Sequence, residues 1–232
     1  KNYALQHRRA VVFILCLFII SVIIYVFDEG YSSRLQNEEF SEIQDFILEL
    51  REKDKDIYNP LEINVVEKKV KGIDVSSFQG AIDWEKVRNT GIEFAMIRCG
   101  YRNLSNAEIH EDKTFRYNVE EANRLGIPVG IYFYSTARNE KEVLEEATFV
   151  LNLIKDYDIT YPVVYDFEMF NQKRTKGVND KRINDNAVQF LDYLRAHGYD
   201  GMLYSNLNAL NNHWDIEKFF GYKLWYAQYI NR

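Results

Sequence analysis

The chain of 232 residues has little of several residue types that define whole classes of protein. Two cysteines, Cys16 and Cys99, supply neither a disulfide framework nor a cysteine-based zinc or iron–sulfur site. None of the four histidines lies at helical spacing from another, so we expect no metal and no cofactor. A net charge of −6 lacks the basic excess of a protein that binds nucleic acid regardless of sequence. With 47% hydrophobic residues and three prolines, the chain is typical of a globular domain rather than a disordered one.

One hydrophobic run is long. Residues 10–27 read AVVFILCLFIISVIIYVF, which is 18 residues without a charge, a glycine or a proline. As a helix the run spans roughly 27 Å, close to the ~30 Å hydrocarbon core of a bilayer. A cleaved signal peptide is the alternative, but its apolar region is usually ~7–15 residues long, and Phe27-Asp28-Glu29 is a poor cleavage site. We therefore predict a transmembrane helix after a short segment, residues 1–9.

The charge changes sign across this run, from +3 over residues 1–27 to −5 over residues 28–71. By the positive-inside rule, residues 1–9 are cytoplasmic and everything after residue 27 is outside. We therefore expect a single-pass protein of the cell membrane with an extracytoplasmic domain.

A charged spacer, residues 28–71, follows the run. From Phe40 to Leu50 its apolar residues recur three or four apart, which predicts a helix with one narrow apolar stripe. A solvated spacer helix is the simpler interpretation. A weak dimer through a short coiled coil is the alternative, although two heptads are little evidence.

From residue 72 onward, β-rich runs alternate with helical stretches. The predicted strands are residues 72–76, 94–100, 129–135, 163–168, 202–206 and 224–229. The predicted helices are residues 83–90, 114–125, 139–156 and 180–197, all but the third followed by a glycine that favours a left-handed cap. This alternation implies parallel strands with right-handed crossovers. An open doubly wound sheet and a barrel share the pattern, but no phosphate-binding glycine motif follows the first strand, which favours the barrel.

Carboxylates stand near the ends of two predicted strands. Asp166 and Glu168 alternate with apolar residues in strand 163–168, and Asp74 takes a similar place in strand 72–76. Because the large apolar side chains must pack on helices, we expect all three carboxylates to face the barrel mouth, where such barrels hold their active sites. Mutual repulsion and partial desolvation should raise at least one pKa. A helix cap or an arginine partner is the alternative for each carboxylate alone, and a Mg²⁺ or Ca²⁺ site is the alternative for the cluster.

Aromatic residues accompany the carboxylates. Those expected at the mouth are Tyr132, Tyr134, Tyr204, Trp225, Tyr226 and Tyr229. Aromatic faces suit the C–H faces of sugar rings, and a carboxylate pair is what glycoside hydrolysis uses. This combination favours a glycosidase over a cation site, although about half of these tyrosines are expected to be core residues.

An ordered set of motifs resembles the glycoside hydrolase family 25 lysozymes. In chain order they are GIDVSSFQG (72–80), DW (83–84), FAMIR (94–98), GIPVGIY (126–132), DFE (166–168), LYS (203–205) and LWYAQY (224–229). The resemblance implies an α/β fold, a TIM-like (β/α) barrel of irregular closure. It also implies cleavage of the β-1,4 bond between N-acetylmuramic acid and N-acetylglucosamine, with peptidoglycan glycan strands as substrate.

The same resemblance implies roles for individual residues. Glu168 would be the general acid, with Asp166 and Asp74 as supporting carboxylates. The residues that would line the sugar cleft are Arg98, Tyr132, Tyr204 and Trp225. The nucleophile stays open, and with it the choice among a retaining, an inverting and a substrate-assisted mechanism.

The chain departs from the family pattern in two ways. The family commonly has a histidine where Phe133 stands, and its barrel continues beyond strand 224–229 to further strands and a late aspartate. Residues 72–232 form the predicted catalytic domain. Because six strands do not close a barrel, we expect the C-terminal end of this domain to be missing from the chain. A membrane-tethered protein that binds cell-wall glycan without cutting it is therefore one alternative. A chitinase-like barrel is another, although only the final D-x-E of its D-x-x-D-x-D-x-E motif is present.

The charge step predicts the topology directly. A protease added outside intact cells should release a soluble fragment that begins after about residue 31, because the positive segment is retained inside. Immunoblotting of the supernatant checks this. Full protection of the fragment in intact cells, with release only after lysis, would reverse the orientation.

Overall fold

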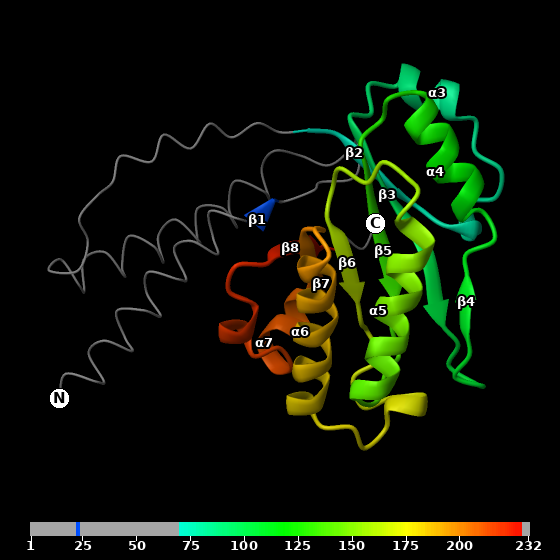
Figure 1. Cartoon of the computed structure of the whole chain (residues 1–232). Helices are drawn as coiled ribbons and strands as arrows, with labels where there is room; N and C mark the ends of the chain where they lie inside the picture. The colour runs from blue at the N-terminus through cyan, green and yellow to red at the C-terminus, as the bar shows by residue number, and fades with distance from the viewer. Residues whose placement is uncertain (1–21, 24–69, 229–232) are drawn as a thin grey trace, which may run out of the picture. The chain divides into compact units, whose positions relative to one another are not determined.

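The computed structural model of the chain describes residues 22–23 and 70–228 (Figure 1). They fall in one compact unit, Val22–Tyr25 with Val70–Arg232. All but two residues of the predicted transmembrane helix and nearly all of the predicted spacer lie outside the described residues, and so does the predicted dimer contact. Among the helices that the structure describes, none combines the length and the apolar character needed to cross a bilayer.

Of residues 10–27, for which the sequence predicts a transmembrane helix, the structure describes only Val22 and Ile23, and these two residues are not helical. Val22–Ile23 forms a two-residue strand, β1, whose backbone pairs in parallel with Leu224 and Trp225. Both residues are β-branched, and an unpaired strand edge is a ready template for such a segment. At these two positions the pairing takes the place of helical hydrogen bonds.

The core of the unit is a curled parallel sheet. Its strands are β2 (Gly72–Val75), β3 (Phe94–Arg102), β5 (Val129–Tyr134), β6 (Val163–Asp166), β7 (Gly201–Asn206) and β8 (Lys223–Ala227). Their spatial order is β1-β8-β7-β6-β5-β3-β2, and every one of these pairs is parallel. The six predicted strands are therefore confirmed in order. Within the described residues β1 and β2 are the two edges of the sheet and do not pair with each other. The predicted barrel is therefore an open half-barrel.

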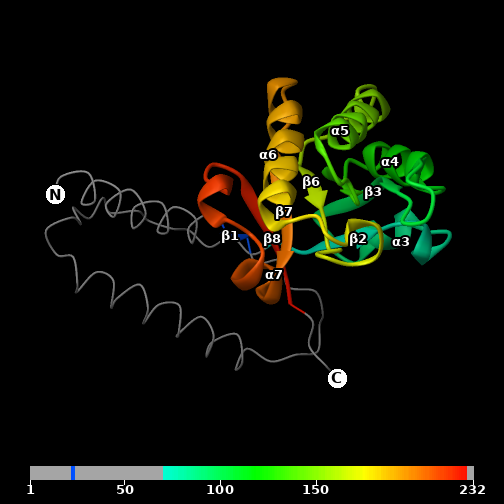
Figure 2. The ribbon, with the colours of Figure 1, turned by 90° about the horizontal axis from the view of Figure 1, so that it is seen from below.

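Helices connect the strands, and α4 (Phe115–Arg124), α5 (Glu140–Ile154) and α6 (Asp180–Ala196) cover one face of the sheet (Figures 1 and 2). The shorter elements are α3 (Trp84–Asn89), α7 (Leu207–Asn212) and the 3-10 turns η1 (Ser77–Gln79), η2 (Lys173–Thr175) and η3 (Ile216–Phe219). Asp83, Asn139 and Asn179 accept N–H bonds at the starts of α3, α5 and α6. The glycines after α3, α4 and α6 have φ of 80°, 69° and 91°, as the left-handed cap requires.

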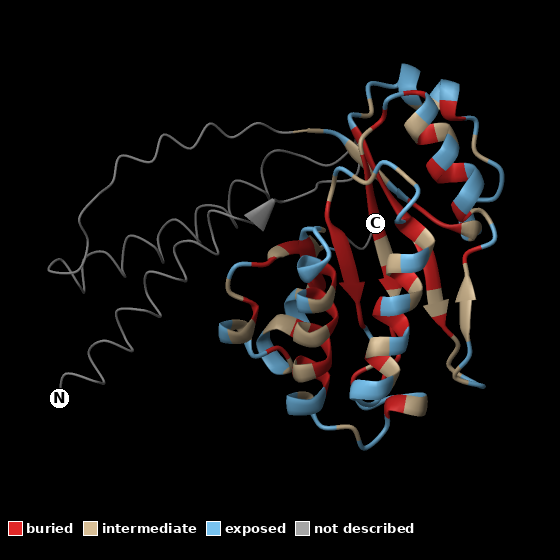
Figure 3. Cartoon of the chain, in the orientation of Figure 1, coloured by how far each residue is buried: buried red, intermediate tan, exposed pale blue. Residues whose placement is uncertain are grey.

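Most residues of the central strands are buried (Figure 3), and the two faces of the sheet bury different side chains. On the helix-covered face, the ring of Phe190 from α6 contacts those of Phe133 and Tyr165. On the inner face, a core cluster comprises Phe94, Met96, Val164, Met202, Tyr204 and Trp225. This alternation puts the side chains at positions 164 and 166 of β6 on the inner face, as the sequence predicts.

A three-residue strand, β4 (Ile109–Glu111), is, like β1, a strand of this sheet that the sequence pattern does not predict. It pairs antiparallel with the end of β3. Just before this pairing, the register of β3 against β5 shifts between Arg98 and Gly100. A Cβ on Gly100 would lie 2.5 Å from the carbonyl oxygen of His110 and 2.9 Å from the ring of Phe149. Backbone therefore approaches backbone too closely at this point for any side chain.

We expect Gly100→Ala to lower the free energy of unfolding by about 1–3 kcal/mol, because backbone must move to admit the methyl group. Gly130→Ala is the matched comparison, since its Cβ would first meet the flexible end of Met96, at 2.5 Å from the sulfur. Urea unfolding of both variants measures the difference. A loss for Gly100→Ala no larger than that for Gly130→Ala would show that β4 moves aside freely.

Candidate functional site

The centre of the site is the carboxyl of Asp166 at the end of β6. Asp166 pairs in register with Tyr134 on β5 and Tyr204 on β7, so it lies on the inner face between two aromatic positions. Its side chain is only 6% exposed, and its Oδ1 atom is buried without a hydrogen-bond partner. Desolvation raises the pKa of Asp166 well above its usual value, and the charges of Glu168 and Asp74 add to the rise while Arg98 opposes it.

Two further carboxyls lie close enough to act on Asp166. Glu168 is exposed, but the surrounding protein reduces its hydration and raises its pKa. Asp74 on β2 is exposed beside the open sheet edge, and partial desolvation raises its pKa too, against a backbone hydrogen bond that lowers it. The structure therefore brings together all three carboxylates predicted from the sequence.

This arrangement favours proton transfer. Interacting carboxyls titrate as a group, so a poorly hydrated cluster holds a proton at a pH where isolated carboxyls are ionised. One member then donates a proton while another stays charged, which is the division of labour in acid–base catalysis by carboxylate pairs. Among the described residues, no three His, Cys, Asp or Glu side chains are placed to hold a metal ion.

Three aromatic side chains form what we call the aromatic floor: Tyr132, Tyr204 and Trp225. The ring of Trp225 meets that of Tyr204 at 5.2 Å and that of Tyr132 at 5.9 Å, both edge to face. Tyr204 and Trp225 are only 8% and 7% exposed and belong to the inner core cluster. Tyr132 is half-buried, and burial raises its pKa above the usual range. In the aromatic floor, Tyr204 and Trp225 therefore pack in the core, and Tyr132 offers a small accessible surface near the carboxyls.

Arg98 is held by protein partners. Its Nε donates to Oδ2 of Asp112 at 2.8 Å, and its Nη2 lies 2.7 Å from the same oxygen and 3.1 Å from the hydroxyl of Ser77. In this position Arg98 acts on the site through its charge, which offsets part of the rise in the pKa of Asp166. The guanidinium also lies 4.7 Å from the ring centre of Phe78, which is 84% exposed.

Sequence reasoning missed Asp112 and Phe78 as parts of this region. Buried Asp112 accepts the backbone N–H of Ser77, so it fixes both Arg98 and the turn after β2. An aspartate two residues before the helix-capping position Thr114 offers no signal beyond capping. Phe78 stands in the GIDVSSFQG motif, and its position after a strand end was the available signal.

Comparisons with known proteins agree with this geometry. A family model described as "Glycosyl hydrolases family 25" matches residues 73–232. Among curated proteins, an autolytic lysozyme of Clostridium acetobutylicum is 27% identical over 139 residues, which are 60% of this chain and 39% of the relative. Lysozyme M1 of Streptomyces globisporus is 35% identical over 66 residues, 28% of this chain and 21% of the relative. The chain therefore spans about two fifths or less of the length of these relatives.

Solved structures extend the likeness to the fold. The modular autolysin LytC of Streptococcus pneumoniae has a TM-score of 0.60 and 29% identity, covering 69% of this chain and 38% of that one. The same autolysin is also known in complex with a synthetic peptidoglycan ligand. A family 25 glycosyl hydrolase of Bacillus anthracis has a TM-score of 0.57 at 22% identity, covering 71% of this chain and 72% of that one, and shares the fold.

The buried carboxyl of Asp166 predicts a stability cost that depends on pH. Because its pKa is raised on folding, its ionisation opposes folding as pH rises from about 3.9, the unfolded value, through the folded pKa. We expect the free energy of unfolding of Asp166→Asn, measured in urea at pH 7, to exceed that of wild type by about 1–3 kcal/mol. The difference should vanish near pH 4. Asp156→Asn, at an exposed position, is the control. A destabilised Asp166→Asn at pH 7 would mean that the carboxylate is well solvated.

Proposed function

Since this chain belongs to glycosyl hydrolase family 25, we propose that its domain 72–232 is a peptidoglycan hydrolase, a lysozyme-type N-acetylmuramidase. The bond cleaved is the β-1,4 link between N-acetylmuramic acid and N-acetylglucosamine. The family model covers nearly the whole of this domain, and the relatives named above are lysozymes and an autolysin. The observation that carries the proposal is the buried carboxyl of Asp166 at the end of β6, with Glu168 and Asp74 near enough for their charges to raise its pKa.

Glu168 is the general acid in this proposal. Of the two carboxyls only Glu168 is exposed, so only it reaches the leaving oxygen of a bound glycan. Its raised pKa favours the protonated form that donation requires. Asp166 is buried close to Glu168, and the raised pKa of each carboxyl favours a state in which the pair shares one proton.

The supporting groups act on the charge that develops in the sugar. Glycoside hydrolysis passes through an oxocarbenium-like state, which a nearby carboxylate stabilises. Asp74, exposed on β2 and close enough for its charge to raise the pKa of Asp166, is the group we assign to that charge or to orienting the substrate's own N-acetyl group. The aromatic floor supplies an apolar surface for a sugar ring, with the half-buried Tyr132 its most accessible member.

We also propose that the domain is tethered to the outer side of the cell membrane. The support is the uncharged run of residues 10–27 and the change from +3 to −5 across it. A helix through the whole run requires Val22 and Ile23 to leave their pairing with β8. A tether of this kind would keep the enzyme near wall peptidoglycan, with the charged residues 28–71 as spacer.

Glu168→Gln tests the proposed acid, because the amide keeps the shape of the side chain but has no proton to donate. We expect hydrolysis of purified peptidoglycan to fall by roughly 10²–10⁴-fold, while sedimentation with peptidoglycan stays unchanged. Release of reducing ends measures cleavage, with chitin as a second substrate on which wild type should be inactive. Glu217→Gln, exposed on η3, is the matched control.

Other outcomes assign the alternatives. Wild-type binding to peptidoglycan without release of reducing ends would make the chain a wall-binding protein. Cleavage of chitin would favour a chitinase-like activity. If Glu168→Gln kept wild-type turnover while Asp166→Asn abolished it, the two roles would be exchanged.

A further inference from the structure

The proposed acid, Glu168, stands outside regular structure. It belongs to a segment that we call the acid loop, residues 167–175, which leaves the sheet after β6 and ends in η2. Phe167 anchors one end, with its buried ring stacked on Tyr165 and edge to face with Phe170. The position of Glu168 therefore depends on the contacts that hold the rest of this loop.

The acid loop is strained. Asn171 and Lys173 have φ of 50° and 45°, in the left-handed region that residues with a Cβ rarely adopt. Asparagine tolerates this conformation, but lysine has no local hydrogen bond that favours it. Such a conformation persists only where surrounding contacts impose it, and it is frequent at functional sites. Inside the loop the hydroxyl of buried Thr175 donates to the carbonyl oxygen of Met169, and the loop is anchored to the rest of the fold at this second end.

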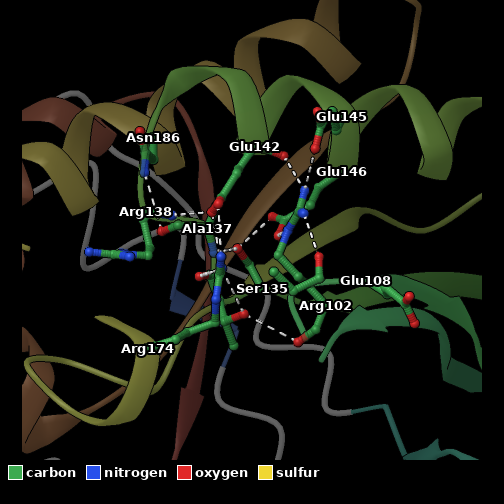
Figure 4. Close-up of polar contacts among 12 residues, drawn as sticks. Arg102, Glu108, Ser135, Ala137, Arg138, Glu142, Glu145, Glu146, Arg174 and Asn186 are labelled. Atoms are coloured by element: carbon green, nitrogen blue, oxygen red, sulfur yellow. Dashed lines mark hydrogen bonds and ion pairs between the residues drawn. The ribbon is translucent and has the colours of Figure 1, made fainter. Parts of the chain in front are cut away.

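Arg174 supplies that anchor (Figure 4). Its two terminal nitrogens donate to the two carboxylate oxygens of Glu142 on α5, at 2.8 Å and 3.0 Å, and one of them also donates to the carbonyl of Thr136. The pair is well shielded, with side-chain exposures of 12% for Arg174 and 20% for Glu142. Two-pronged contacts of this kind fix geometry as well as distance.

Glu142 is itself fixed from the other side. One of its oxygens accepts the backbone N–H of Arg138 at 2.8 Å, ahead of the first turn of α5. Burial works against ionisation of Glu142, but the bonds from Arg174 and Arg138 lower its pKa below the usual value, so it stays charged. The helix N-terminus favours the same negative charge.

A buried layer beneath the pair links it to the sheet. Arg102 on β3 donates to the carbonyl oxygen of Glu142 at 2.7 Å and to the carboxylate of Glu146 at 2.7 Å. The hydroxyl of Ser135 donates to Glu146 at 2.6 Å, and its backbone N–H donates to the carbonyl of Asp166 at 2.7 Å. The start of α5, which anchors the acid loop, is thus tied to the strand end that carries Asp166.

We propose that the Arg174–Glu142 ion pair positions the acid loop so that the carboxyl of Glu168 stays beside that of Asp166 in the partly desolvated mouth. Arg174 and Glu142 are positioning residues, because neither is placed among the carboxyls of the mouth. The inference rests on the role proposed for Glu168. Without the pair, the loop relaxes its left-handed residues and Glu168 moves toward bulk water.

Arg174→Gln in the full chain tests the proposal. We expect kcat on peptidoglycan to fall by about 10–100-fold with KM changed less than about twofold, because misplacement of a reacting group affects the chemical step. Glu142→Gln should do the same, and the double variant should be no worse than either single variant. Arg174→Lys keeps the charge and one bond, so it should recover part of the lost kcat.

The matched control is Arg124→Gln. Arg124 makes an equally close two-pronged pair with Glu121 on α4, at 3.1 Å and 2.8 Å, but at an exposed site away from the acid loop. This variant should keep wild-type kcat. Equal losses in Arg124→Gln and Arg174→Gln would overturn the proposal, since any surface arginine would then matter as much.

The ionisation of Glu168 gives a readout that a merely structural role would not move. The ionisable groups around it are Asp166 and Tyr134, and Asp166 in turn faces Asp74 and Arg98. Relaxation of the loop toward water should lower the pKa of Glu168, so the alkaline limb of the pH–rate profile should move to lower pH in Arg174→Gln. Carboxyl ¹³C NMR titration of Glu168 measures the same shift without any substrate.

The two measurements separate the possible failures. An unchanged Glu168 titration and an unchanged kcat in folded Arg174→Gln would overturn the positioning role. If the titration of Glu168 shifts in Arg174→Gln but the wild-type protein cleaves no peptidoglycan, the proposed function is overturned and the positioning role stands. If Arg174→Gln does not fold, as near-ultraviolet circular dichroism would show, Arg174→Lys and Glu142→Gln carry the test by the same criteria.

Discussion

The burial of the Asp166 carboxyl is the constraint on which the rest of the site depends. A carboxylate removed from water without hydrogen-bond partners is costly, and the structure leaves one of its oxygens without any. The cost is contained in two ways: the pKa rises, so the group stays protonated over a wider pH range, and the positive charge of Arg98 opposes the rise. Arg98 has this effect only because Asp112 and Ser77 hold it in place.

Strand alternation decides which carboxyls meet. Tyr165 and Phe167 are fully buried aromatic residues whose rings stack, and Tyr165 also packs on α6, so the helix-covered face claims them. Asp166 must then point to the inner face, where the neighbouring positions in register are Tyr134 and Tyr204. Burial of the apolar side chains thus decides where the acidic residues lie. No attraction among the acids is needed, since their charges repel one another.

The same logic explains how much the sequence predicts. Six strands, four helices and the convergence of Asp74, Asp166 and Glu168 follow from local alternation and from glycines after helices, because each depends on neighbours in the chain. The engagement of Arg98 by Asp112 and the burial of the aromatic floor depend on tertiary packing. So does the pair of Arg102 and Glu146, which are 44 residues apart. Residues 22–23 pair with the edge of β8, a contact that no local pattern indicates.

Structural and functional charges differ in how they are partnered. Arg102 with Glu146 and Arg174 with Glu142 are shielded pairs in which each charge meets an opposite one at hydrogen-bond distance. Even so, burial raises the pKa of Glu146 to about 7, against the bonds from Ser135 and Arg102 that lower it. Among the described residues, the buried side-chain atoms without a partner are Asp166 Oδ1, Asn186 Oδ1 and Trp214 Nε1, and of these only Asp166 is ionisable. A fold that pairs its other buried carboxylates but leaves this one incomplete concentrates its electrostatic cost at the mouth, beside the exposed Glu168. Strongly perturbed carboxyls are frequent where acid–base catalysis takes place, whereas the paired charges hold the scaffold.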